Sequence, residues 1–246
     1  MLLVLICAIG VGGATMIGAI IGYIFRSATE RYADTVLAFA AGVSIAAAVM
    51  SLILPSLEYG GDLGLIITII GIYAGALAIS LFDKLLLRIG NMRSYSSEDG
   101  IRRGRVLLFV LAIALHNLPE GIAAGVGFGG DGVSGAFVIA IGIALQNLPE
   151  GMMIIAPMLS LGIKPHRALL YALMTGAVEV VGTFIGYFAV SAAEAILPFS
   201  LSFAGGTMLY VVAGEMIPET QRTGSRLATY ALLSGFVTML IFDAII

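Results

Sequence analysis

The chain has 246 residues, of which 60% are hydrophobic and only 11% are charged, and its formal net charge is −3. A soluble domain carries about 25% charged residues, so this composition excludes a soluble globular protein. The apolar runs are continuous, whereas the strands of a membrane β-barrel alternate in polarity. The composition therefore predicts an all-α integral membrane protein with a single polytopic domain. The one cysteine, Cys7, cannot form an internal disulfide and is expected to be a small apolar helix residue.

Eight stretches approach the roughly 20 apolar residues that a membrane-spanning helix needs. They cover residues 2–25, 35–57, 63–87, 106–127, 136–160, 167–193, 200–218 and 226–245. The first is expected to be a retained span rather than a signal peptide, because it has no basic start and no small-residue cleavage site. The only long connection, 88–105, is rich in serine, glycine and arginine, which predicts a solvated linker.

The basic residues indicate how these spans are oriented. All 12 lysines and arginines fall on one side of an eight-span arrangement, and the opposite connections carry only acidic residues: Glu58, Asp62, Asp131 and Glu194. A seven-span arrangement would scatter the basic residues over both sides. Because positive residues favour the cytoplasmic side, the partition predicts eight spans, a cytoplasmic 88–105 loop and both termini outside.

A nine-residue motif occurs twice in the fourth and fifth spans. IALHNLPEG at 113–121 and IALQNLPEG at 143–151 differ at one position. The two helices run in opposite directions, so the copies are expected to face each other at similar depth. Pro119 and Pro149 each leave one backbone carbonyl without its helical partner. Inside the membrane such a carbonyl must contact protein, water or an ion.

Each copy also presents two polar side chains four residues apart on one helix face, with an asparagine three residues before the glutamate on the adjoining edge. These side chains are His116, Asn117 and Glu120 in the first copy and Gln146, Asn147 and Glu150 in the second. A third carboxylate, Glu179, lies in the middle of the sixth span, and no lysine or arginine is near any of the three. A charge at mid-membrane costs about 3 kcal/mol on insertion scales. The carboxylates must therefore be protonated, hydrated or neutralised by a cation.

This set of side chains suits a divalent cation. Imidazole nitrogen and carboxylate oxygen are ligands that zinc and neighbouring metals accept. The oxygens suffice for a second ion, with Glu120 and Glu150 as candidate bridges. A metalloprotease of the HExxH kind is excluded, because the chain has only two histidines, His116 and His166, and they cannot share a helix face.

The paired HNLPEG and QNLPEG motifs, with a VE pair in the sixth span, resemble the ZIP (ZRT/IRT-like) divalent metal transporters over essentially the whole chain. The glutamine version of the motif is similar to their GufA-like branch. The resemblance implies a bundle with a binuclear metal site between spans 4, 5 and 6, in which Glu120 and Glu150 are shared. The implied ligands are His116, Glu120, Gln146 and Glu150 for the first ion, and Asn117, Asn147 and Glu179 for the second.

The resemblance further implies a homodimer and a sliding motion of spans 1, 4, 5 and 6 against the others. Where many relatives have a second histidine this chain has Gln146, a weaker zinc ligand, so Cd²⁺, Mn²⁺ and Fe²⁺ join Zn²⁺ as expected substrates. Some relatives take a methionine ligand from the second span; here Ser44 occupies that position and Met50 lies about two turns away. Neither is assigned a role.

The sequence therefore predicts a transporter, not an enzyme, that moves divalent metal cations into the cytoplasm. It needs no resident cofactor and no nucleic-acid partner, and the short chain fits a bacterial inner membrane. The alternative is a proton-coupled solute carrier that uses the membrane carboxylates as a relay. Glu215 and Glu219, four residues apart in the seventh span, are either an exit step for the ion or an interfacial pair in water.

Overall fold

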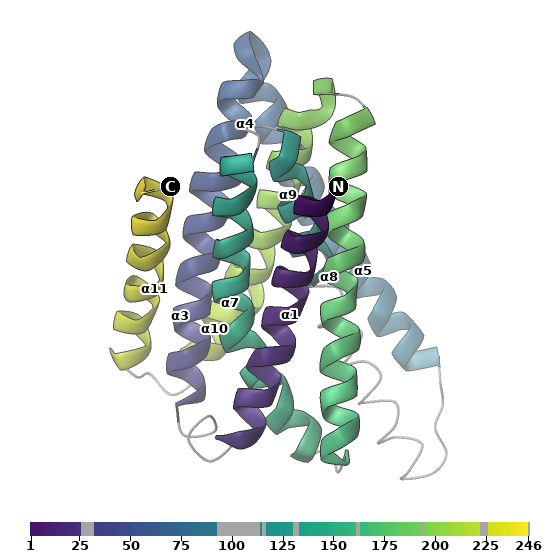
Figure 1. Cartoon of the computed structure of the whole chain (residues 1–246), viewed down its shortest axis with the longest axis vertical. Helices are drawn as coiled ribbons and strands as arrows, with labels where there is room; N and C mark the ends of the chain where they lie inside the picture. Colours follow the sequence, from purple (N-terminus) through teal and green to yellow (C-terminus); the bar gives the residue numbers. More distant parts are fainter. Residues whose placement is uncertain are drawn as a thin grey trace.

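The structure is a computed structural model that describes residues 1–25, 32–92, 114, 117–129, 133–160, 163–192, 194–221 and 226–245. It is a bundle of long helices (Figure 1). In these residues seven stretches are long and apolar enough to cross a membrane: Leu2–Ile24, Asp34–Tyr59, Gly61–Phe82, Gly135–Met152, Pro165–Ser191, Leu197–Thr220 and Arg226–Ile245. The prediction of an all-α, multi-pass membrane protein is confirmed. The predicted span 106–127 lies mostly outside the described residues, which include a helical stretch at 117–126, so the count of eight stays a prediction.

Five helices run without a change of type: α1 (Leu2–Ile24), α5 (Gly64–Met92), α7 (Val133–Ser160), α8 (Pro165–Ala192) and α11 (Arg226–Ile245). Two further spans change type along their length. The first consists of α3 (Ala33–Ala46), the π-helical segment η1 (Ala47–Ile53) and α4 (Leu54–Tyr59). The second consists of α9 (Leu197–Val211), the π-helical segment η5 (Val212–Met216) and α10 (Ile217–Thr220). Short 3₁₀ turns are η2 (Gly61–Leu63), η3 (Gly127–Gly129) and η4 (Glu194–Ile196).

The two π-helical segments were not predicted from the sequence, although each has a recognisable signal. Pro55 lies two residues beyond η1, and Pro218 lies two residues beyond η5. A proline inside a helix removes one backbone donor and clashes with the preceding turn. A wider turn before the proline accommodates this mismatch, and such turns are frequent at functional sites.

The helices alternate in direction, so their ends gather at two levels (Figure 1). α1, α5 and α7 end at the lower level in this view, where α3, α8 and α11 begin, and both chain termini lie toward the upper level. Lys164, Arg167 and Arg226 lie at the starts of α8 and α11, whereas Glu58 and Glu194 lie at the opposite ends of the helices. The described charged residues thus follow the predicted partition of basic from acidic connections.

Glycines at which backbones touch link the described helices into two groups, and α3 also packs against α7 across them. The first group contains α1, the stretch 117–126, α7 and α8; the second contains α3–η1–α4, α5, α9–η5–α10 and α11. A Cβ at Gly12 of α1 would lie 2.4 Å from the backbone oxygen of Gly176 in α8. A Cβ at Gly235 of α11 would lie 2.0 Å from the backbone oxygen of Phe39 in α3. Small residues at such contacts are what holds membrane helices together.

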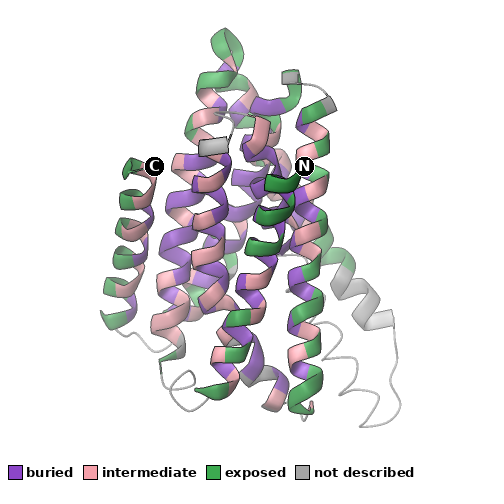
Figure 2. Ribbon diagram, viewed as in Figure 1, coloured by how far each residue is buried: buried purple, intermediate pink, exposed green. Residues whose placement is uncertain are grey.

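The contact between the two groups is of a different kind. Among the described glycines, each one whose Cβ would strike the backbone of another helix meets a helix of its own group. A Cβ at Gly142 of α7 would instead meet side-chain atoms of Ala47 and Met239 in the second group. Buried alkyl side chains such as Val43 and Ile143 fill this contact. Figure 2 shows the buried faces turned inward and the exposed faces turned outward. The exposed residues include many large hydrophobic side chains, as expected for lipid contact.

The glycine contacts predict a sharp difference between two neighbouring residues of α1. Gly12→Ala would force α1 away from α8, whereas a Cβ at Gly13 meets nothing within 4 Å. We expect Gly12→Ala to destabilise the protein by about 1–3 kcal/mol, the usual cost of overpacking. Gly13→Ala should be neutral or stabilise the helix, because alanine has the higher helix propensity. Thermal unfolding of both variants in detergent is the measurement, and equal melting temperatures would contradict the packing described here.

Candidate metal centre

The predicted site residues meet near the middle of the bundle. Gln146 and Asn147 lie halfway along α7, and Glu179 lies halfway along α8. These three side chains have no exposed surface, and Asn117 and Glu120, in the helical stretch 117–126, are 3% and 6% exposed. Five of the seven predicted residues are thus buried in the described segments, and the sixth, Glu150, is half-buried in α7. The seventh, His116, lies outside the described residues.

Close helix contacts bring the site together. A Cβ at Gly121, directly after Glu120, would lie 2.2 Å from the backbone oxygen of Glu179. A Cβ at Gly151, directly after Glu150, would lie 2.1 Å from the backbone oxygen of Thr15 in α1. These two glycines, which end the two repeated motifs, therefore let a neighbouring helix approach closely. The second glycine also delivers a residue of α1 to the site.

Glu179 is held by three neutral donors from three segments. Thr15 Oγ1 donates to Glu179 Oε1 at 2.7 Å, and Asn117 Nδ2 donates to the same oxygen. Asn147 Nδ2 donates to Glu179 Oε2 at 2.6 Å and also to the backbone oxygen of Val11 at 3.2 Å. Hydrogen bonds of this kind stabilise a buried carboxylate where no basic partner is present. Thr15 was not named from the sequence; a hydroxyl beside the small residues GGA in an apolar span was the available signal.

Within the part of the chain that the structure describes, Glu120 has a hydrogen-bond partner on one oxygen only. Gln146 Nε2 donates to Glu120 Oε1, and Gln146 Oε1 accepts a hydrogen bond from Ser44 Oγ at 2.7 Å. Glu120 Oε2 is buried and has no hydrogen-bond partner among the described residues, and the same holds for Asn147 Oδ1. A buried acceptor left unpaired costs about 1–3 kcal/mol. Both unpaired atoms are oxygens, which are the atoms that a cation would take as ligands.

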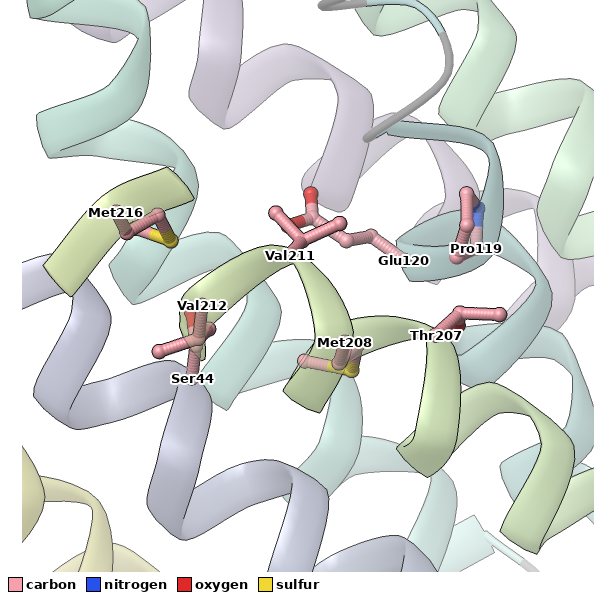
Figure 3. A pocket seen from close by; sticks show the side chains of 8 residues that line it. All are labelled: Ser44, Pro119, Glu120, Thr207, Met208, Val211, Val212 and Met216. Atoms are coloured by element: carbon pink, nitrogen blue, oxygen red, sulfur yellow. The ribbon is translucent and has the colours of Figure 1, made fainter. Parts of the chain in front are cut away.

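A small cavity lies beside Glu120, between the two helix groups (Figure 3). Its volume of about 10 Å³ is near the minimum that holds one water molecule. Ser44 comes from α3, Pro119 and Glu120 come from the stretch 117–126, and the other lining residues come from α9 and η5 (Figure 3). Those other residues are Thr207, Met208, Val211, Val212 and Met216. Hydroxyl, carboxylate and thioether groups therefore surround a space the size of a single small guest.

The three carboxylates are close enough to interact electrostatically, since Glu120 and Glu179 each interact with Glu150 and Glu120 also interacts with Glu179. Among the described residues, no group of three or more His, Cys, Asp or Glu side chains is arranged to hold a metal ion. Amide and hydroxyl side chains lie between the carboxylates, and His116 is outside the described residues. The set of seven metal ligands accordingly stays a prediction.

Three residues without an assigned role are also placed by the structure. Ser44 joins the site, as described above. Met50, in η1, packs against the hydrophobic core and does not line the cavity. Glu219 lies half-buried in α10, at the level where the helices with basic ends begin. Met208 and Met216 were missed by the sequence analysis, because methionines in apolar spans are usually core residues.

The hydrogen bonds to Glu179 predict a measurable role for Thr15. Thr15→Val removes the hydroxyl at nearly constant volume and leaves the Glu179 carboxylate with one donor fewer. We expect a loss of about 1–2 kcal/mol in stability, which for a chain of this size lowers the melting temperature by about 2–8 °C. Thr15→Ser keeps the hydroxyl and should melt close to the wild type. If Thr15→Val melts as the wild type does, the hydroxyl contributes nothing to the site.

Comparison with known proteins shows the family to which this chain belongs. Residues 94–243 match the family model described as "ZIP Zinc transporter". The chain is 38% identical over 200 residues to "Zinc transporter GufA" of Myxococcus xanthus, covering 78% of this chain and 79% of that protein. It is 34% identical to "Zinc transporter ZIPB" of Bordetella bronchiseptica, covering 94% and 77% of the two chains. It is 30% identical to "Zinc transporter ZIP11" of Xenopus tropicalis, covering 94% and 93%. The chain therefore belongs to the ZIP family of membrane transporters, with GufA-like relatives, and is not an enzyme.

Proposed function

We propose that this protein carries divalent metal cations across the membrane into the cytoplasm, through the polar cluster in the middle of the bundle. The observation that supports this most directly is the unpaired oxygen of Glu120, buried at 6% exposure beside a cavity of about 10 Å³. A partly satisfied carboxylate at this depth is costly unless a cation completes it. The names of the relatives make zinc the first candidate, with Cd²⁺, Mn²⁺ and Fe²⁺ as further substrates.

We assign the cation two neighbouring positions. The first uses His116, Glu120, Gln146 and Glu150; the second uses Asn117, Asn147 and Glu179 and shares the two glutamates of the first. The unpaired Oε2 of Glu120 favours the first position as the one that fills more readily. The oxygens of Glu179 already accept three hydrogen bonds, so a cation there must compete with the amides of Asn117 and Asn147.

The proposed direction of transport follows from the basic residues at one end of the helices. If the end that carries the basic residues faces the cytoplasm, both termini lie outside and the interior-negative potential draws cations inward. A divalent ion gains about 4.6 kcal/mol per 100 mV on crossing, twice the single-charge value. We place the protein, as a homodimer, in a bacterial inner membrane, with residues 88–105 as a cytoplasmic linker.

Transport also requires that the site open to each side of the membrane in turn. We propose that the first helix group slides against the second with the cation held by the first. The packing supports this, because backbones touch within each group while side chains fill the contact between the groups. The cavity beside Glu120 lies at that contact, where movement would open it.

The first test is metal uptake into proteoliposomes. Glu120→Gln keeps the shape of the side chain but removes its charge, and we expect uptake of Zn²⁺ and Cd²⁺ to fall about 10- to 100-fold, since one charged contact is lost. Glu58→Gln, which changes an exposed carboxylate at the end of α4, is the matched control and should transport normally. Wild-type protein that moves no metal, or a Glu120→Gln variant as active as the control, would refute the proposal. Proton uptake without metal would favour a proton-coupled solute carrier.

The second test is a disulfide across the two groups, made in a Cys7→Ser background. The Cβ of Ala47 and a Cβ built at Gly142 are 3.6 Å apart, within the range that a disulfide spans. Ala47→Cys with Gly142→Cys should block uptake when oxidised and recover it on reduction. The matched pair does not join the two groups: Gly127→Cys, in η3 directly after the stretch 117–126, and Ile139→Cys in α7 have a Cβ separation of 3.7 Å and should remain active when oxidised. Undiminished uptake through the locked Ala47–Gly142 pair would exclude sliding.

A further inference from the structure

The side-chain amide of Gln146 is oriented with its nitrogen toward the candidate cation position. Its Nε2 donates to Glu120 Oε1, and its Oε1 accepts a hydrogen bond from Ser44 Oγ at 2.7 Å. Gln146 has no exposed surface and Ser44 is 2% exposed, so water does not compete for these atoms. The orientation has a clear cause, because a carboxylate can only accept hydrogen bonds and therefore attracts the amide donor.

This orientation is incompatible with Gln146 as a ligand of a cation at Glu120. An amide binds metal ions through its oxygen, whereas its NH₂ group carries partial positive charge and has no acceptor capacity. In the present arrangement the oxygen faces Ser44 and the NH₂ group faces Glu120. Either Gln146 does not contact the cation, or its amide reverses when the cation binds.

We propose that a divalent cation at Glu120 reverses the side-chain amide of Gln146, and that Ser44 is the positioning residue that satisfies the amide in both orientations. This proposal rests on the proposed metal-binding function. Reversal turns Oε1 toward the cation and Nε2 toward Ser44. The serine hydroxyl donates to Oε1 in the first orientation and accepts from Nε2 in the second, because a hydroxyl has one donor and two acceptor positions.

The reversal needs no backbone movement. The terminal torsion of a glutamine side chain is broad and roughly two-fold, so the two orientations place oxygen and nitrogen in nearly the same positions. Ser44 and Glu120 both line the cavity and lie on opposite sides of the amide. An alanine at position 44 would leave the amide atom that faces it without a hydrogen bond from this side chain, whether that atom is Oε1 or Nε2. A methionine there could not donate to the oxygen and would accept only weakly from the nitrogen.

The Ser44–Gln146 hydrogen bond also crosses from the second helix group to the first. Ser44 belongs to α3 and Gln146 to α7. In the orientation seen here, the serine proton links the two groups through the amide oxygen. When the cation binds, this bond is replaced by one in which the amide nitrogen of Gln146 donates to Ser44. The same two residues therefore link the groups in both states, but through a different hydrogen bond.

The test uses infrared difference spectroscopy of the glutamine side-chain carbonyl. The chain contains only two glutamines, Gln146 and the exposed Gln221, so Gln221→Asn leaves one carbonyl to be labelled with ¹³C. Spectra of the full-length protein are recorded with and without Cd²⁺. In the metal-free protein, Ser44→Ala should move the labelled carbonyl band to higher wavenumber, because its hydrogen bond is lost. In the Cd²⁺-loaded protein the wild-type and Ser44→Ala bands should coincide, because the oxygen then faces the metal.

Two controls separate a positioning role from a general structural one. Ser44→Thr retains a hydroxyl and should reproduce the wild-type band in both states. Ser202→Ala removes a buried hydroxyl in α9 that bonds only within its own helix among the contacts described, and should leave the band unchanged. The glutamate carboxylate bands report metal binding independently. If these bands shift with Cd²⁺ while the Gln146 band does not, the reversal is refuted and metal binding stands. If neither shifts, the proposed function falls together with the inference.

Discussion

The burial of carboxylates at the middle of long apolar helices is the constraint on which the rest of this structure depends. Insertion of a charged side chain at that depth costs about 3 kcal/mol or more. The described lysines and arginines lie toward one end of the helices, so they cannot pair with Glu179 in the centre of α8. Neutral donors from α1, α7 and the 117–126 stretch surround it instead. These donors tie three segments to α8, so the same contacts solvate the carboxylate and hold the first helix group together.

Glu120 meets the same constraint with a different result. One oxygen is paired with Gln146, and the other has no partner among the described residues and lies next to a space for a single small ligand. The two carboxylates therefore differ in how completely their oxygens are hydrogen-bonded. Glu179 is committed to hydrogen bonds within its group, whereas Glu120 retains a lone oxygen at the boundary with the second group. In the proposed function, the hydrogen-bonded Glu179 holds the helices in place, and the unpaired oxygen of Glu120 binds and then releases the ion.

The packing of the helices separates rigidity from mobility along the same boundary. Glycine contacts such as Gly12 with Gly176 let backbones interlock within each group, where any relative shift would meet steric resistance. Across the boundary, alanine, valine and isoleucine side chains meet without such interlocking. The wider turn η5, which precedes Pro218, supplies Met216 to the cavity at this boundary. The irregular helix thus lies where the two groups meet at the site.

Much of the fold and part of the site could be predicted from the sequence. Helical spacing placed Gln146 and Glu150 on one face, and both residues lie in the single helix α7. The span that contains His116 lies mostly outside the described residues, so its part of the prediction is not tested. The π-helical segments were missed because a proline in a span indicates a break in the helical ladder but not how the chain absorbs it.

The sequence by itself determined that the protein crosses the membrane, which end of the helices is basic, and which polar side chains share a helix face. Those properties depend on composition and on the 3.6-residue period, which act within one segment. The tertiary structure alone decided that Thr15 reaches Glu179, that Ser44 reaches Gln146, and that one oxygen of Glu120 finds no partner in the described segments. These pairings join residues more than 100 positions apart, and no local period specifies which faces of distant helices meet or which atoms then lie within hydrogen-bonding distance.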